Sequence, residues 1–187
     1  MQRGPADRVV FDHYDLADEA RRESLMGLGN GVLFVRACAP EAAFARHEDD
    51  RAQHYPGLYF AGGYNRAERS INGEQVRITS LVNLPDPFAL SFCIDGEDGW
   101  FSLDDAQVLH YRHRLDLPAG VAGREAVVRD TAGRETELHE TRCVSMADAG
   151  AALLQWRVTP RNWSGTVQVR ALLRTTACNH KLDRTRA

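Results

Sequence analysis

Turn signals recur about every ten residues through the middle and end of this chain, and this spacing constrains the fold more than any other feature. The signals are ING at 71–73, DGEDG at 95–99, DTAG at 130–133 and PRNWSG at 160–165. Each separates short runs of extended, apolar-rich character, and helical periodicity is nearly absent. Many short antiparallel strands produce such a pattern. The sequence therefore predicts an all-β fold with few short helical turns, and the spacing is that of an antiparallel sandwich or barrel.

The expected strands follow the apolar runs between these turns. An irregular lead-in holds a short helical turn within residues 15–26, and GLGNG at 27–31 favours a tight turn because glycine tolerates positive φ. Residues 38–56 carry the charged run HEDDR at 47–51 and are expected to form a solvated loop. Strands are expected at 32–35, 57–65, 76–83, 88–94, 107–117, 124–129, 135–144, 151–159 and 166–172.

The composition indicates one domain of ordinary charge. The chain has 187 residues, of which 43% are hydrophobic, and its formal net charge is −3. Such a length and apolar content suit a single core, and the lack of a basic excess argues against a nucleic-acid partner. No apolar run reaches the roughly 18 residues that a membrane span needs. The polar N-terminus lacks the apolar stretch of a secretory signal, so we expect a cytoplasmic location and no membrane partner.

The histidine and cysteine positions do not favour a metal site. His110 and His113 lie three apart on an expected strand, so their side chains should point to opposite faces. His47 and His54 lie near the acidic residues 48–50, and a solvated charge run explains this group better than a cation site. The cysteines have no close spacing of the kind that zinc knuckles use. They are Cys38, Cys93, Cys143 and Cys178. We expect no metal ion and no cofactor.

Motifs for catalysis are equally sparse. The chain has no Gly-x-Ser-x-Gly sequence, and GLGNG at 27–31 lacks the lysine of a phosphate-binding loop and leads into an expected strand. Sugar hydrolysis needs two converging carboxyl groups, but none of the 26 acidic residues stands in a context that marks it as catalytic. We therefore assign no catalytic residue.

Six segments, in order, resemble the N-terminal domain of glycoside hydrolase and phosphorylase family 65, which includes maltose, trehalose and kojibiose phosphorylases. The strongest is ESLMGLGNGVLFVRA, with its Glu, Ser and Leu followed by Gly-Asn-Gly and an arginine. The chain departs from the family pattern after Ala171, where Leu172 and Leu173 lead into a different tail. The six segments are Glu23–Ala37, Tyr55–Arg66, Leu81–Asp86, Tyr111–Leu117, Gly133–Met146 and Thr159–Ala171.

The resemblance implies a galactose-mutarotase-like supersandwich at residues 1–172, followed by an atypical tail at 173–187 that holds the only lysine, Lys181. In the family this domain precedes an (α/α)6 barrel, which supplies the general acid for an inverting reaction on an α-glucoside. We expect a non-catalytic domain whose partners are an α-glucoside or the missing barrel, and a homodimer. A frameshift or a truncated linker would explain the tail, and a natural short protein is the alternative.

If residues of this domain contact sugar or the barrel, the polar side chains of the glycine-rich segments are the candidates, since arginine and tyrosine suit sugar hydroxyls and domain interfaces. These are Asn30, Arg36, Tyr59, Tyr64 and Asn65. Scaffolding of turns and sheets is the competing interpretation of the same residues. A stand-alone carbohydrate-binding module is an alternative function. An aldose epimerase is a third, but its histidine and glutamate pair cannot be located. The disaccharide, and the choice between phosphorolysis and hydrolysis, remain open.

Overall fold

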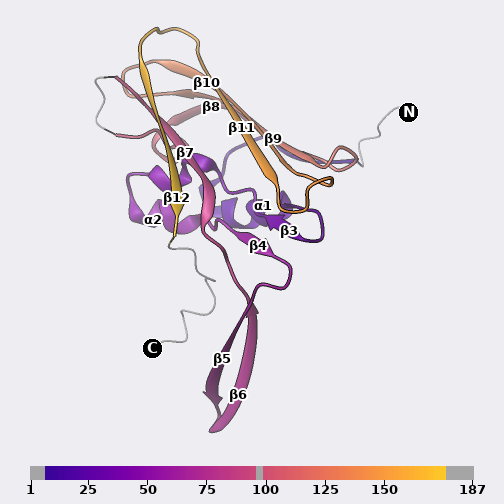
Figure 1. The fold of residues 1–187 in the computed structure, drawn as a ribbon. Helices are drawn as coiled ribbons and strands as arrows, with labels where there is room; N and C mark the ends of the chain where they lie inside the picture. Colours follow the sequence, from indigo (N-terminus) through magenta and orange to yellow (C-terminus); the bar gives the residue numbers. More distant parts are fainter. Residues whose placement is uncertain (1–6, 96–98, 176–187) are drawn as a thin grey trace.

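The structure is a computed structural model that describes residues 7–95 and 99–175, and it confirms the all-β prediction. An antiparallel sheet of five strands packs against a sheet of two strands, with the helices and a small sheet of the N-terminal segment beside them (Figure 1). A long hairpin projects away from this body. In the described ranges, no helix has the length and apolar character needed to cross a membrane.

The five-stranded sheet has the order β1-β8-β9-β10-β11. Its strands are β1 (Arg8–Phe11), β8 (Gln107–Asp116), β9 (Val121–Arg129), β10 (Glu135–Val144) and β11 (Ala152–Pro160). The turn from β9 to β10 is the predicted DTAG turn. The Asp130 carboxylate accepts the backbone N–H groups of Ala132 and Arg134, both at 2.9 Å, and Gly133 takes a φ of 80°. Side-chain bonds of this kind and a glycine at positive φ fix the hairpin locally.

The second sheet contains β7 (Asp86–Ile94) and β12 (Val167–Arg174). Val167 lies opposite Ile94 and Val169 opposite Phe92, so these valines share the face on which Phe92 and Ile94 enter the core. β12 continues through Leu173 and Arg174, and most of the expected tail, including Lys181, lies outside the described residues. The core between the sheets is formed by Phe92, Ile94, Leu103, Tyr111, Ala126, Val128 and Leu138.

The N-terminal segment builds the rest of the body. Its elements are α1 (Glu19–Leu25), β2 (Leu28–Gly29), β3 (Leu33–Val35), α2 (Glu48–Gln53), β4 (Leu58–Phe60) and the 3-10 helices Leu16–Asp18 and Pro40–Phe44. A further 3-10 helix spans Leu103–Asp105. The segment packs on the lower part of the five-stranded sheet, where a second core forms. That core contains Met26, Leu28, Leu33, Val35, Ala37, Leu115, Ala122 and Val144.

The expectation of a solvated loop at 38–56 was wrong for the first part of this segment. The 3-10 helix Pro40–Phe44 lies against β7, and Glu41 is completely buried. Residues 46–49 and 52–53 are exposed as expected, and Asp50 and Arg51 between them are half-buried. The composition of the segment concealed this, because the charged run at its centre is more conspicuous than the buried alanines before it.

The projecting hairpin, hereafter the arm, consists of β5 (Tyr64–Ile71) and β6 (Glu74–Leu81). Its tight turn confirms the predicted ING signal, because Asn72 and Gly73 take φ values of 53° and 87°. Both residues at positive φ define a turn that suits the twist of two strands. Most side chains of the arm are exposed, and Figure 1 shows it extending from the body near β4.

Candidate functional site

The structure assigns structural contacts to two of the five predicted site residues, Asn30 and Arg36. The Asn30 side chain accepts from the backbone N–H groups of Val32 and Leu33 at 2.9 and 2.8 Å, and it donates to the carbonyl of Ser145 at 2.6 Å. It therefore closes the GLGNG turn and ties this turn to the end of β10. These bonds use the donors and acceptors that a sugar hydroxyl would need.

Arg36 is held just as firmly. Its guanidinium donates to the carbonyls of Tyr55 and Ala20 at 2.7 and 2.6 Å and to the Ser24 hydroxyl. The guanidinium carbon also lies 4.4 Å from the centre of the Tyr55 ring. Arg36 thus joins α1 to the segment before β4.

The other three predicted residues lie at the base of the arm. Tyr59 and Tyr64 line a groove of about 510 Å³, together with Phe34 and Phe60. Tyr64 is 60% exposed, and the Tyr59 hydroxyl donates to the Tyr55 hydroxyl at 3.1 Å. Asn65 follows Tyr64 on β5 but points to the other face of the arm, since side chains alternate along a strand. The structure therefore brings two of the predicted residues into one aromatic groove.

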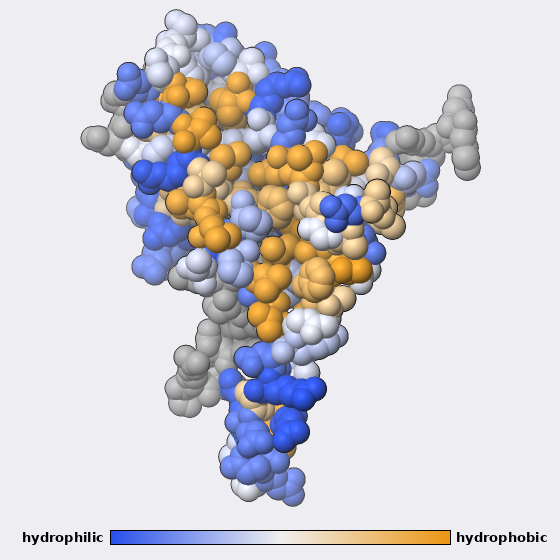
Figure 2. Space-filling view, in the orientation of Figure 1, coloured by the Kyte–Doolittle hydropathy of each residue, from blue (hydrophilic) through white to orange (hydrophobic). Residues whose placement is uncertain are grey.

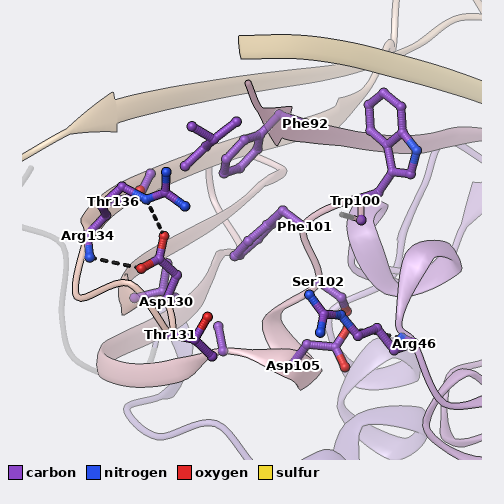
Figure 3. A pocket seen from close by; sticks show the side chains of 14 residues that line it. Arg46, Phe92, Trp100, Phe101, Ser102, Asp105, Asp130, Thr131, Arg134 and Thr136 are labelled. Atoms are coloured by element: carbon purple, nitrogen blue, oxygen red, sulfur yellow. Dashed lines mark hydrogen bonds and ion pairs between the residues drawn. The ribbon is translucent and has the colours of Figure 1, made fainter. Parts of the chain in front are cut away.

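A second hollow lies between the two sheets, beside β7 (Figure 3). Its apolar wall is formed by Phe92, Trp100 and Phe101. An ion pair lies at one end and a hydrogen bond at the other. At one end Arg134 donates to Asp130 at 2.7 Å, and at the other the backbone N–H of Arg46 donates to Asp105 at 3.0 Å. The hollow encloses only about 90 Å³, which is much less than the roughly 300 Å³ or more of ordinary ligand pockets.

The interior also contains a network of buried charges, which the sequence analysis missed. Arg124 on β9 donates to Glu41 at 2.6 and 2.7 Å and to Glu140 on β10 at 3.0 Å. Arg142 donates to Glu140 at 2.9 Å and to the carbonyls of Arg36 and Cys38, both at 2.8 Å. Burial would raise the pKa of Glu140, but the two arginines hold it below its ordinary value.

A second part of this network surrounds His54. The ring contacts Glu23 at 2.8 Å through Nδ1 and Asp104 at 3.3 Å through Nε2. Burial disfavours the charged ring, but hydrogen bonds to Asp104, Cys38 and Glu23 raise the pKa of His54 far above its ordinary value. Burial would raise the pKa of Asp104, and the bond from His54 lowers it. The prediction that His54 lies in a solvated charge run was wrong, because the ring is buried beside Glu23 and Asp104.

Burial shifts the pKa of two further groups near this network. Burial raises the pKa of Glu19, which lies 3.4 Å from Arg22, to about 7. Burial also lowers the pKa of His113 to about 4, and its Nδ1 has no hydrogen-bond partner. The prediction that His110 and His113 point to opposite faces is confirmed, since His110 is exposed and His113 buried. The side chains of Glu19 and His113 are buried, so they can hold elements of the fold together but cannot contact a sugar.

The alternation on β10 was a signal for this network that sequence reasoning overlooked. Residues Leu138 and Val144 mark the buried face, and the same period places Glu140 and Arg142 on it. On β9 the buried alternation likewise places Arg124 between Ala122 and Ala126. Opposite charges at inward positions of neighbouring strands predict a buried ion pair.

Comparison with known proteins places the chain in a family. The sequence profile described as glycosyl hydrolase family 65, N-terminal domain, matches residues 9–187. An uncharacterized glycosyl hydrolase of Mycobacterium tuberculosis is 41% identical over 178 residues, which are 95% of this chain and 13% of that protein. A kojibiose phosphorylase of Caldanaerobacter subterraneus is 30% identical over 177 residues, which are 94% of this chain and 21% of the phosphorylase.

A solved structure supports the fold. A putative kojibiose phosphorylase from the human microbiome superposes with a TM-score of 0.73 at 18% identity, covering 87% of this chain and 21% of that one. The chain therefore spans about a fifth or less of the length of these relatives. The resemblance expected from six ordered segments is confirmed.

Proposed function

Because the chain belongs to glycosyl hydrolase family 65, as its N-terminal domain, we propose that it is the non-catalytic domain of an inverting α-glucoside phosphorylase or hydrolase. Its role there is to support the catalytic barrel, which is its main partner. The relatives that are named kojibiose phosphorylases support a parent activity on α-glucosides. Its location is the cytoplasm.

The observation that carries this proposal is an apolar surface beside β12, which we call the open side. Figure 2 shows hydrophobic side chains gathered over β12 and across towards β11 and the β3–β4 region. Val169 and Leu173 are 66% and 63% exposed, and β12 pairs only with β7 among the described strands. A surface of this kind is typical of a face that meets another part of a protein.

The buried charges support the same proposal. The carboxylates of Glu23, Glu41 and Glu140 are all less than a tenth exposed and are bound to arginine or histidine. A general acid must reach the glycosidic oxygen of a bound sugar, and these three groups face the interior. The Glu41–Arg124 pair joins the N-terminal segment to the five-stranded sheet, and the Glu23–His54 pair joins α1 to the end of α2, as expected of a scaffold.

The test is to assay the purified chain on kojibiose, trehalose and maltose, with and without inorganic phosphate. We expect no release of glucose or glucose 1-phosphate above a blank without protein. Release that is proportional to the protein concentration, and that survives repurification, would contradict a non-catalytic role.

A second function, carbohydrate binding, is favoured by the aromatic groove. Rings of Phe34, Phe60 and Tyr64 are exposed together, and aromatic faces stack on the apolar faces of sugars. Titration calorimetry with the same disaccharides would show saturable heats, which Tyr64→Ala should abolish. Absence of heat at millimolar sugar would remove this second function and leave the scaffold role.

A further inference from the structure

Glu23, Cys38 and His54 converge in the interior although they come from three separate segments. Their ligand atoms all lie within 4.8 Å of one another, and all three residues are nine-tenths or more buried. From this geometry we propose that the three side chains bind a divalent transition-metal ion, with zinc as the ion that the ligand set suits best. We call them the zinc cluster.

The fold determines this convergence. Glu23 lies on α1, Cys38 follows β3, and His54 directly follows α2. The backbone N–H of Ala37 donates to the carbonyl of Glu23 at 2.9 Å, which holds Cys38 near α1. The backbone N–H of Tyr55 donates to the Glu23 carboxylate at 2.8 Å, which does the same for His54. The backbone therefore positions each ligand before any ion arrives.

The second nitrogen of His54 supplies an independent argument. While Nδ1 faces Glu23, Nε2 lies 3.3 Å from a carboxylate oxygen of Asp104. Asp104 in turn accepts from the hydroxyls of Tyr14 and, at 3.1 Å, Ser102. Histidines that bind metals commonly donate their other N–H to a carboxylate, which fixes the tautomer and the orientation of the ring. His54 has this arrangement, with Nδ1 as the ligand atom.

The chemistry of the three donors selects the ion. One thiolate, one imidazole and one carboxylate are ligands that zinc accepts, and the softness of sulfur disfavours magnesium and calcium. Tetrahedral zinc with bonds of about 2.0–2.3 Å separates its ligand atoms by roughly 3.3–3.6 Å. To reach that spacing, the 2.8 Å distance between His54 Nδ1 and Glu23 Oε1 would have to lengthen by about 0.5 Å. A non-protein oxygen would take the fourth position.

Charge balance is compatible with this site. Zinc displaces the proton of the Cys38 thiol and one proton of the His54 ring, so two positive charges enter and two protons leave. Arg36, 3.7 Å from the Glu23 carboxylate, and Asp104 keep their charges. The buried cluster thus carries the same net charge with and without zinc, which avoids an uncompensated charge in the core.

Cobalt is the best probe, because a thiolate bound to Co²⁺ gives a near-ultraviolet charge-transfer band and visible bands of tetrahedral geometry. The chain should be purified without a metal-affinity tag, treated with chelator and titrated with Co²⁺, then with Zn²⁺. We expect saturation at one equivalent and loss of the cobalt bands when zinc is added.

Cys38→Ala should reduce the charge-transfer band at least tenfold, and Cys143→Ala, the control at a half-buried cysteine, should leave it unchanged. Near-ultraviolet circular dichroism of each apo variant verifies folding. His54→Gln, in an otherwise folded chain, should weaken cobalt binding at least tenfold. No band in the folded chain, or an equal band in folded Cys38→Ala, would mean that the cluster is held by hydrogen bonds only and would overturn the proposal.

Discussion

Arg124 and Glu41 form a two-pronged ion pair across the interior, with N–O distances of 2.6 and 2.7 Å between residues 83 apart in the sequence. Arg124 lies on β9 of the five-stranded sheet, and Glu41 lies on the 3-10 helix that packs against β7. Both side chains are buried. This ion pair therefore connects the N-terminal segment to the five-stranded sheet.

Removing one partner of this pair should be costly. Arg124→Met leaves the Glu41 carboxylate buried without its arginine, and we expect a loss of about 3–5 kcal/mol in the free energy of unfolding. The double variant Arg124→Met/Glu41→Met should recover part of that loss, since it removes both charges. Urea denaturation followed by circular dichroism measures both. The exposed pair Glu68–Arg77 is the matched control, and Arg77→Met should cost less than about 1 kcal/mol. Equal costs at the two sites would refute this interpretation.

Glu19 should make the stability depend on pH. Burial raises the pKa of its folded form to about 7, above the ordinary value of 4.5. Between these values the folded state holds a proton that the unfolded state has lost, so stability falls as the pH rises from 4.5 to 7. The stability of wild type relative to Glu19→Gln should therefore decrease by at most about 3 kcal/mol between pH 5 and pH 8.

The measurement for Glu19 is urea denaturation of both proteins at each pH. Glu48→Gln, at an exposed position on α2, is the control and should show the same pH dependence as wild type. If the stability of Glu19→Gln changes with pH in the same way as that of wild type, burial does not raise the pKa of the Glu19 carboxyl group in the folded protein.

The local signals of the sequence predicted most of the strands, although β1 and most of β5 lay outside the expected ranges, and they did not predict the network. The ING turn and the DTAG turn specify their own conformations through positive φ and side-chain bonds, so reading them needs no knowledge of the rest of the fold. The pairing of Arg124 with Glu41, by contrast, depends on how a distant 3-10 helix packs on β7. Pairing across such separations is a property of topology, which the alternation along one strand does not contain.

In the candidate site, too, the local features were predictable from the sequence and the long-range contacts were not. Tyr64 directly follows Gly63 and Tyr59 lies two residues after Gly57, and their shared groove follows from the local turn at the base of the arm. His54 was assigned to its neighbours in the sequence, the acids at 48–50, whereas its contacts are Glu23 and Asp104. A charged run predicts that its residues are exposed to solvent. The burial of His54 becomes visible only in the structure, where the end of α2 packs against α1.

Substitutions at Asn30 and Tyr64 should differ in their effect on stability, because Asn30 has structural contacts and Tyr64 lies in the exposed groove. Asn30→Ala removes a side chain that bonds two backbone N–H groups and two carbonyls, and we expect a loss of about 1–3 kcal/mol in stability. Tyr64→Ala changes a side chain that is 60% exposed, and we expect a change within about 0.5 kcal/mol. Thermal and urea unfolding give both values. A stable Asn30→Ala variant would show that the turn does not need its side chain.

The open side should control self-association. Val169 is 66% exposed on the core-facing side of β12, and two chains that bury such surfaces against each other gain apolar contact. Val169→Lys should therefore shift the sedimentation coefficient towards that of a monomer at concentrations where wild type forms dimers or larger species. Gln168→Lys adds the same charge at the neighbouring, exposed position on the other face of β12 and should leave the distribution as in wild type.

If both variants dissociate the assemblies equally, net charge is the cause. If wild type is monomeric at all concentrations, the open side does not pair with itself, and the homodimer expected from the sequence is wrong.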